Sequence, residues 1–154
     1  VGSQEKIEIA KKYGCDEVIN YSKEDFAKKV MELTDGKGVS VVYDGVGKST
    51  YDKSIECLKL RGTMVSFGNA SGALDPIIVS KSLQPKGIYF VRPAMNQYFT
   101  NSEEIHEAAN MLFKQISSGN VKIEIYKKYK LEDAVQAHKD LEGRKITGPA
   151  VIIP

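Results

Sequence analysis

The first residues of the chain combine a cation with hydroxyl groups. Ser3 and Lys6 stand at the start of a segment with helical spacing, and Tyr21 follows the next apolar segment. A lysine and hydroxyl donors suit a phosphate monoester, because each donates hydrogen bonds to its oxygens. The alternatives are a plain surface lysine at Lys6 and a tyrosine that covers the core at Tyr21.

Two glycine-containing turns resemble phosphate-binding loops but lack their spacing. Gly45-Val46-Gly47 would need a third glycine or alanine three residues further on, where Thr50 stands. Gly36-Lys37-Gly38 lacks the spacing of a P-loop. We therefore predict ordinary turns at both places, with the Gly45 turn lying beneath a bound nucleotide.

Apolar runs alternate with segments of helical spacing along most of the chain. The strands predicted from these runs are Asp16–Asn20, Val39–Asp44, Gly62–Phe67 and Gly87–Val91. This alternation is typical of βαβ units. It predicts an α/β fold with a Rossmann-like open, mainly parallel, twisted sheet and helices on both faces. The Gly-rich turn expected after the first strand is not in the sequence, so we expect the sheet to lack its first strand and that turn.

The pattern changes after residue 120. Val121, Ile123 and Ile125 alternate with Lys122 and Glu124, which predicts a half-exposed strand. A helix over Leu131–Leu141 and a strand over Pro149–Ile153 are expected to follow. We therefore predict a partial dinucleotide-binding domain over residues 1–120 and a carboxyl-terminal segment over residues 121–154.

The position of the first cluster favours one class of nucleotide. Parallel sheets bind nucleotides beyond the carboxyl ends of their strands, and NAD-selective folds place a carboxylate at the end of the second strand. The corresponding stretch here, Val1–Gln4, has no carboxylate. With Ser3, Lys6 and Tyr21 nearby, this favours NADP(H) over NAD(H).

Composition excludes several other classes of function. The net charge of +2 is small, and the densest basic stretch, Lys127–Lys130, is short, which argues against a nucleic-acid partner. Cys15 and Cys57 match no CxxC pattern, so we expect reduced thiols in a cytoplasmic protein and no metal site. No apolar run approaches the about 20 residues of a membrane span.

His106 and His138 have no partner at ligand spacing, and we predict no catalytic residue.

Several segments carry a family resemblance: Glu17–Tyr21, Val41–Gly47, Gly62–Asn69, Tyr89–Pro93 and Gly148–Pro154. In order and spacing they resemble the zinc-free quinone oxidoreductases, the zeta-crystallin-like members of the medium-chain dehydrogenase/reductase superfamily. The chain is similar to about the carboxyl-terminal half of such an enzyme. The resemblance implies NADPH as cofactor and NADPH-dependent reduction of quinones as the activity of the whole enzyme.

The resemblance also implies positions that contact the cofactor. Those that match the site of the adenosine 2′-phosphate are Gly2, Ser3, Lys6 and Tyr21.

Phe67, Gly68 and Asn69 match a loop on the nicotinamide side of the cofactor. Arg144 matches a basic residue that reaches the cofactor. Gly45 stands where relatives can carry a serine, which removes one possible hydrogen bond.

Arg92 is expected near the substrate entrance, with a plain surface arginine as the equal alternative.

The same resemblance implies what lies outside this chain. The family's catalytic domain, pyrophosphate turn and first strand precede Val1, and the segment over residues 121–154 returns to that catalytic domain. We therefore expect the isolated chain to be inactive. There are two alternatives. The first is an enoyl or alkenal reductase of the same superfamily, and the second is a non-catalytic role in nucleic-acid binding or as a structural protein. A homodimer through the sheet edge at Gly87–Val91 is expected, because pairing removes an exposed apolar edge.

Overall fold

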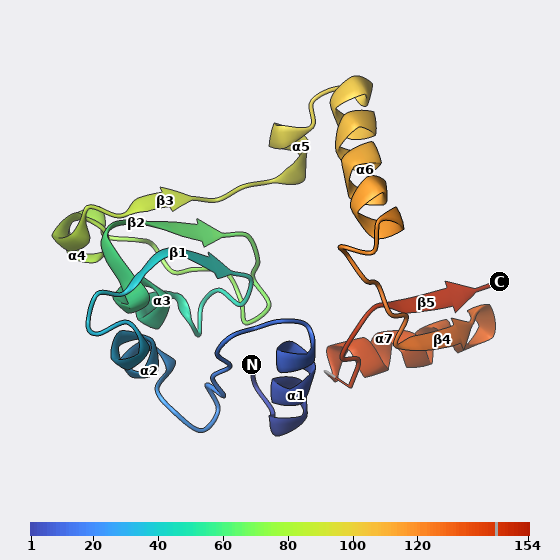
Figure 1. Ribbon diagram of the computed structural model, residues 1–154, viewed down its shortest axis with the longest axis horizontal. Coiled ribbons are helices and arrows are strands. Elements are labelled where there is room, and N and C mark those ends of the chain that lie inside the picture. Colours follow the sequence, from blue (N-terminus) through green and yellow to red (C-terminus); the bar gives the residue numbers. More distant parts are fainter. Residues whose placement is uncertain (144) are drawn as a thin grey trace. The chain divides into compact units, whose positions relative to one another are not determined.

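A parallel three-stranded sheet is the centre of the first of two units of the chain (Figure 1). The computed structural model describes residues 1–143 and 145–154. Its two units are Val1–Tyr98 and Phe99–Pro154. The predicted division after residue 120 refers to a domain outside this chain and stays a prediction.

The strands of the first sheet are β1 (Val39–Asp44), β2 (Leu58–Ser66) and β3 (Tyr89–Val91). They pair in the order β1-β2-β3, and both pairs are parallel. The register sets Asp44 beside Ser66. Because the strands run in the same direction, their carboxyl ends meet at one edge of the sheet, and the loops that follow them start side by side. The predicted fold class, a parallel sheet with helices, is confirmed.

The core of this unit lies between the sheet and the helices that connect its strands. Helix α3 (Tyr51–Cys57) packs against β1 and β2, and α2 (Phe26–Leu33) packs against α3. The buried apolar cluster consists of Tyr51, Leu58, Met64 and Ile88. The unit's other helical segments are α1 (Gln4–Lys12), α4 (Val79–Ser82), the short 3-10 helix η1 (Gln84–Lys86) and α5 (Met95–Tyr98).

Two predicted strands are wrong, for the same physical reason. Residues 16–20 and 121–125 are not strands, although their sequences have strand character. A strand needs a partner along its length. Among the described residues, the segment that runs beside residues 16–20 is Val1, whose nitrogen donates to Ile19 O at 2.8 Å and whose carbonyl accepts from Tyr21 N–H at 3.1 Å.

The second unit contains α6 (Ser102–Ser117), β4 (Lys127–Lys130), the short 3-10 helix η2 (Leu131–Asp133), α7 (Ala134–Glu142) and β5 (Ala150–Ile153). Strands β4 and β5 form a parallel pair that begins where Lys127 meets Ala150. Residues 121–125 precede this pair, and the strand begins at Lys127, where pairing with β5 begins.

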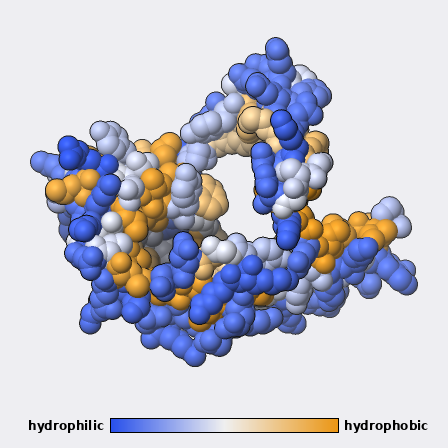
Figure 2. All heavy atoms as spheres, in the orientation of Figure 1, coloured by the Kyte–Doolittle hydropathy of each residue, from blue (hydrophilic) through white to orange (hydrophobic). Residues whose placement is uncertain are grey.

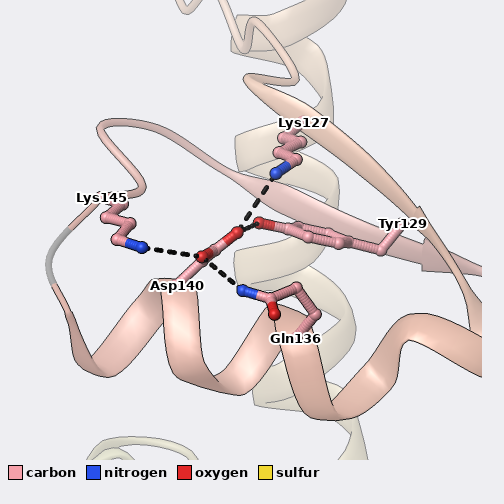
Figure 3. A network of polar contacts seen from close by, with 5 residues as sticks. All are labelled: Lys127, Tyr129, Gln136, Asp140 and Lys145. Carbon is pink, nitrogen blue, oxygen red and sulfur yellow. Dashed lines mark hydrogen bonds and ion pairs between the residues drawn. The ribbon is translucent and has the colours of Figure 1, made fainter.

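A buried carboxylate joins β4 to α7 (Figure 3). Asp140 accepts hydrogen bonds from the Tyr129 hydroxyl at 2.8 Å, the Lys127 ammonium at 3.1 Å and the Gln136 amide at 2.8 Å. Lys145 forms an ion pair with it at 3.7 Å. Hydrogen bonds from Tyr129, Lys127 and Gln136 lower the pKa of Asp140 to about 2.

Large apolar side chains remain at the surface of both units (Figure 2). Tyr43 on β1 is 73% exposed and Tyr89 on β3 is 65% exposed, and Phe113 on α6 is also exposed. None of the helices formed by the described residues has the length and hydropathy needed to cross a membrane.

We expect Asp140→Asn to destabilise the second unit at neutral pH. Because the folded-state pKa lies below that of the unfolded chain, the carboxylate stabilises the fold above about pH 4 and loses this effect as the pH falls. The loss is complete below the folded pKa of about 2. Urea unfolding followed by the NMR signals of Tyr129 measures the difference between variant and wild type at each pH.

The control is Asp133→Asn, which changes an exposed aspartate at the start of α7 that makes no side-chain capping bond. We expect little effect of this variant. A difference between Asp140→Asn and wild type that is the same at pH 7 and pH 2 would contradict the assigned role of the carboxylate.

Candidate nucleotide-binding site

The predicted phosphate-binding residues gather at the start of α1. Ser3 is the N-cap of this helix, and its Oγ accepts from the Lys6 N–H at 3.4 Å. The Tyr21 ring lies beside Gly2, since a Cβ added at Gly2 would sit 2.9 Å from the Tyr21 hydroxyl oxygen. Lys6 lies in the first turn of α1.

A tight turn holds Tyr21 in this position. Asn20 is buried, and its side-chain oxygen accepts from the Ser22 N–H at 3.1 Å. The Ser22 hydroxyl donates to Gly2 O at 3.0 Å. Together with the bonds between Val1 and residues 19–21, this turn fixes Tyr21 next to Gly2. The structure therefore brings together two segments that are far apart in sequence.

The second group of predicted residues lies where β1 and β2 end. The Phe67 N–H donates to Asp44 O at 3.0 Å, which continues the strand pairing into the loops. A Cβ at Gly68 would overlap the carbonyl oxygen of Gly45. A Cβ at Gly45 would lie 2.9 Å from the Phe67 ring. Gly45, Phe67 and Gly68 are thus interlocked, and Asn69 follows them in the same loop.

One cavity is lined by a residue from each group, Tyr21 and Gly45. It has a volume of about 390 Å³, and Val1 and Val46 also line it. The exposed Tyr43 of β1 also lines it. The sequence indicates the two groups separately, and the structure brings Tyr21 of the first and Gly45 of the second to the same cavity.

Arg92 has a structural role that the sequence did not indicate. It follows β3, and its Nη1 donates to Ser66 O at 2.9 Å, Ser66 Oγ at 3.2 Å and Gly68 O at 3.1 Å. The guanidinium therefore holds the loop that carries Phe67 and Gly68. Its expected place near a substrate stays a prediction. Arg144, the other predicted basic residue, lies outside the described residues.

The described residues do not suit a bound zinc ion. Among them, no group of three histidine, cysteine or acidic side chains could hold a metal ion. Cys57 is buried in α3, and burial raises the pKa of its thiol to about 11. Because zinc binds the thiolate, a thiol held protonated is a poor ligand.

Comparisons with known proteins find similarity over nearly the whole chain. A family model described as "Zinc-binding dehydrogenase" matches residues 13–152. The "Quinone oxidoreductase 1" of Escherichia coli (strain K12) is 44% identical over 156 residues, covering 100% of this chain and 48% of the relative. A "2-haloacrylate reductase" of a Burkholderia species is 44% identical over 155 residues, covering 100% of this chain and 46% of the relative.

A solved structure shows the same fold. The crystal structure of Escherichia coli quinone oxidoreductase complexed with NADPH superimposes with a TM-score of 0.95 at 44% identity, covering 100% of this chain and 48% of that one. The chain thus spans about half the length of the relatives that it matches.

We expect Gly68→Ala to destabilise the first unit by roughly 1–3 kcal/mol, because the new methyl group meets rigid backbone. Gly45→Ala is the matched control in the same site, since its methyl group meets only the Phe67 ring, which can rotate away. Urea unfolding of the three proteins gives the comparison. Equal losses in the two variants, or a larger loss in Gly45→Ala, would contradict the interlocked arrangement.

Proposed function

This chain belongs to the zinc-binding dehydrogenase family, and we propose that it is the nucleotide-binding part of an NADPH-dependent quinone oxidoreductase. The observation that carries the proposal is the cavity that Tyr21 and Gly45 both line, one residue from each of the two predicted groups. The relative of known structure that binds NADPH supports the same choice of cofactor.

The residues around the cavity fit the two ends of NADPH. At one end, the Lys6 ammonium and the hydroxyls of Ser3 and Tyr21 would bind the 2′-phosphate, and the amino-terminal end of α1 adds favourable partial positive charge. At the other, the loop carrying Phe67 and Gly68 would lie along the nicotinamide, with Asn69 beside it.

NADPH, when bound, supplies the hydride for the reduction. We propose that this chain binds and orients the cofactor and contributes no acid, base or metal ligand. Arg144 would contribute a further positive charge to the cofactor, and Arg92 would face the substrate with the nitrogens that do not hold the loop.

The other half of the enzyme would complete both the sheet and the active site. Within the part of the chain that the structure describes, β1 pairs only with β2, so its outer edge faces the cavity. We propose that a strand and a pyrophosphate-binding turn from the rest of the protein occupy part of this space. We propose that residues 121–154 join the catalytic domain, that the chain alone has no turnover, and that the enzyme is cytoplasmic.

Haloacrylates are a second candidate class of substrate. The relative named for 2-haloacrylate reduction is as similar as the quinone oxidoreductase, at 44% identity each. Both substrate classes carry a double bond made electron-poor by a carbonyl group. The residues described here contact mainly the cofactor, so we propose that the substrate domain decides between the two.

Calorimetric titration with NADPH, NADH and 2′-phospho-AMP tests the cofactor assignment. We expect both phosphorylated ligands to bind and NADH to bind much more weakly. Lys6→Ala should weaken 2′-phospho-AMP by about tenfold, the equivalent of 1.4 kcal/mol, and leave NADH unchanged.

Lys11→Ala is the matched control, because Lys11 is an exposed lysine in the last turn of the same helix. Equal affinity for NADH and NADPH, or an equal effect of both lysine variants, would refute the assignment. Reduction of a quinone by this chain alone, at the rate of an intact relative, would refute its proposed inactivity.

We also propose a homodimer through residues 87–91. Strand β3 ends the described sheet, and Tyr89 on it is 65% exposed. An unpaired edge is open to association, and a two-fold pair is the simplest closed solution.

Sedimentation equilibrium at micromolar concentrations should detect this dimer. Tyr89→Glu should shift the protein to the monomer, because two carboxylates would meet across the two-fold axis. Tyr98→Glu, at an exposed tyrosine outside the strand, should leave the dimer intact. A wild-type chain that stays monomeric throughout would rule the proposal out.

A further inference from the structure

Asp44, the last residue of β1, is a buried carboxylate surrounded by neutral donors. It is 5% exposed. Its Oδ1 accepts from the N–H groups of Val46 at 2.8 Å and Gly47 at 3.0 Å. Its Oδ2 accepts from the hydroxyls of Thr50 at 2.8 Å and Ser54 at 2.9 Å. No ion pair to Asp44 occurs among the residues that the structure describes.

These donors bind the charged form of the carboxylate. Burial alone would raise the pKa of Asp44, but the hydrogen bonds from Gly47, Thr50, Ser54 and Val46 outweigh burial and hold the pKa below its ordinary value. A buried charge without a cationic partner is costly unless several donors satisfy it. Asp44 therefore fixes the positions of all four donors at once.

The donors belong to the turn that leads from β1 into α3. Thr50 is the N-cap of α3, yet its side chain caps no helix N–H, because the hydroxyl is turned to Asp44. Gly47 has a φ of +90°, a conformation that L side chains rarely adopt. The carboxylate thus holds residues 45–50 in one conformation and anchors the first turns of α3 to the end of β1.

The loop over residues 67–72 is built on this turn. Val46 O accepts from the Ser71 N–H at 2.7 Å and from the Ser71 hydroxyl at 2.8 Å. Gly45 O accepts from the Ala70 N–H at 3.3 Å, and the Lys48 N–H donates to Gly72 O at 3.3 Å. The conformation of the second loop therefore depends on that of the first.

We infer that Asp44 is the positioning residue of the nicotinamide-side loop. Asp44 lines the same cavity, but its carboxylate oxygens are taken up by the four donors, so it acts through the turn over residues 45–50. The inference has two halves. The first, the effect of Asp44 on the loop, is a property of the free protein. The second, the effect of Asp44 on cofactor binding, rests on the proposed function.

Hydrogen exchange of the ligand-free chain tests the first half. In Asp44→Asn, one carboxylate oxygen becomes an NH₂ group that cannot accept from Thr50 and Ser54. We expect the Ala70 and Ser71 amides to exchange at least about tenfold faster, equivalent to 1.4 kcal/mol of opening free energy, while the core amide of Met64 is unchanged.

The matched control is Asp75→Asn, which removes an exposed carboxylate that forms an ion pair with Lys48 beside the same loop. We expect no change at Ala70 and Ser71. Ser54→Ala removes a single donor, and it keeps the test available if Asp44→Asn does not fold. It should give a smaller increase at the same two amides. The inference would be overturned if Asp44→Asn and Ser54→Ala both sped up exchange over the whole first unit. It would also be overturned if neither of these two variants changed exchange at Ala70 and Ser71.

Ligand affinity tests the second half. We expect Asp44→Asn to weaken NADPH binding about tenfold and to leave 2′-phospho-AMP unchanged, because the latter reaches only Ser3, Lys6 and Tyr21. Equal loss for both ligands would show a general structural role and overturn the inference. If the wild-type chain binds neither ligand, the proposed function fails, while the exchange experiment still decides whether Asp44 holds the loop.

Discussion

The parallel register that sets Asp44 beside Ser66 is the constraint on which the site depends. It makes two loops start side by side at one edge of the sheet, so their backbones must approach closely. Gly45 and Gly68 permit that approach because neither carries a Cβ. From one side the Asp44 carboxylate holds the first loop, and from the other Arg92 holds the second at Gly68 O. The loops are thus fixed by the sheet and by two charged side chains.

Much of this could be predicted from sequence, and the failures share a cause. The alternation of apolar runs with segments of helical spacing predicts residues 39–44 and 62–67 as parallel strands. Residues 16–20 and 121–125 have equally good patterns but no partner strand within the part of the chain that the structure describes, and periodicity cannot reveal a missing partner. The role of Arg92 depends on the register between β2 and β3, which the sequence does not specify. Thr50 and Ser54, six and ten residues after Asp44, were a signal that could have been recognised.

The two groups of site residues differ in how their positions are secured. Ser3 and Lys6 lie on one helical turn, so the sequence alone places them together. Tyr21 joins them only through the Asn20 turn and the pairing of Val1 with residues 19–21. The cavity that Tyr21 and Gly45 line is also bordered by β1. This agrees with relatives about twice as long as this chain, and we propose that their additional half supplies the substrate site.

The central claim is that one bound nucleotide contacts both groups of residues. NMR titration of the ¹⁵N-labelled chain with NADPH tests it directly. We expect backbone amide signals of Gly2, Ser3 and Tyr21 to shift together with those of Gly45, Phe67 and Gly68, with one common dissociation constant. Shifts confined to the second unit, or two groups of signals that titrate independently, would contradict it.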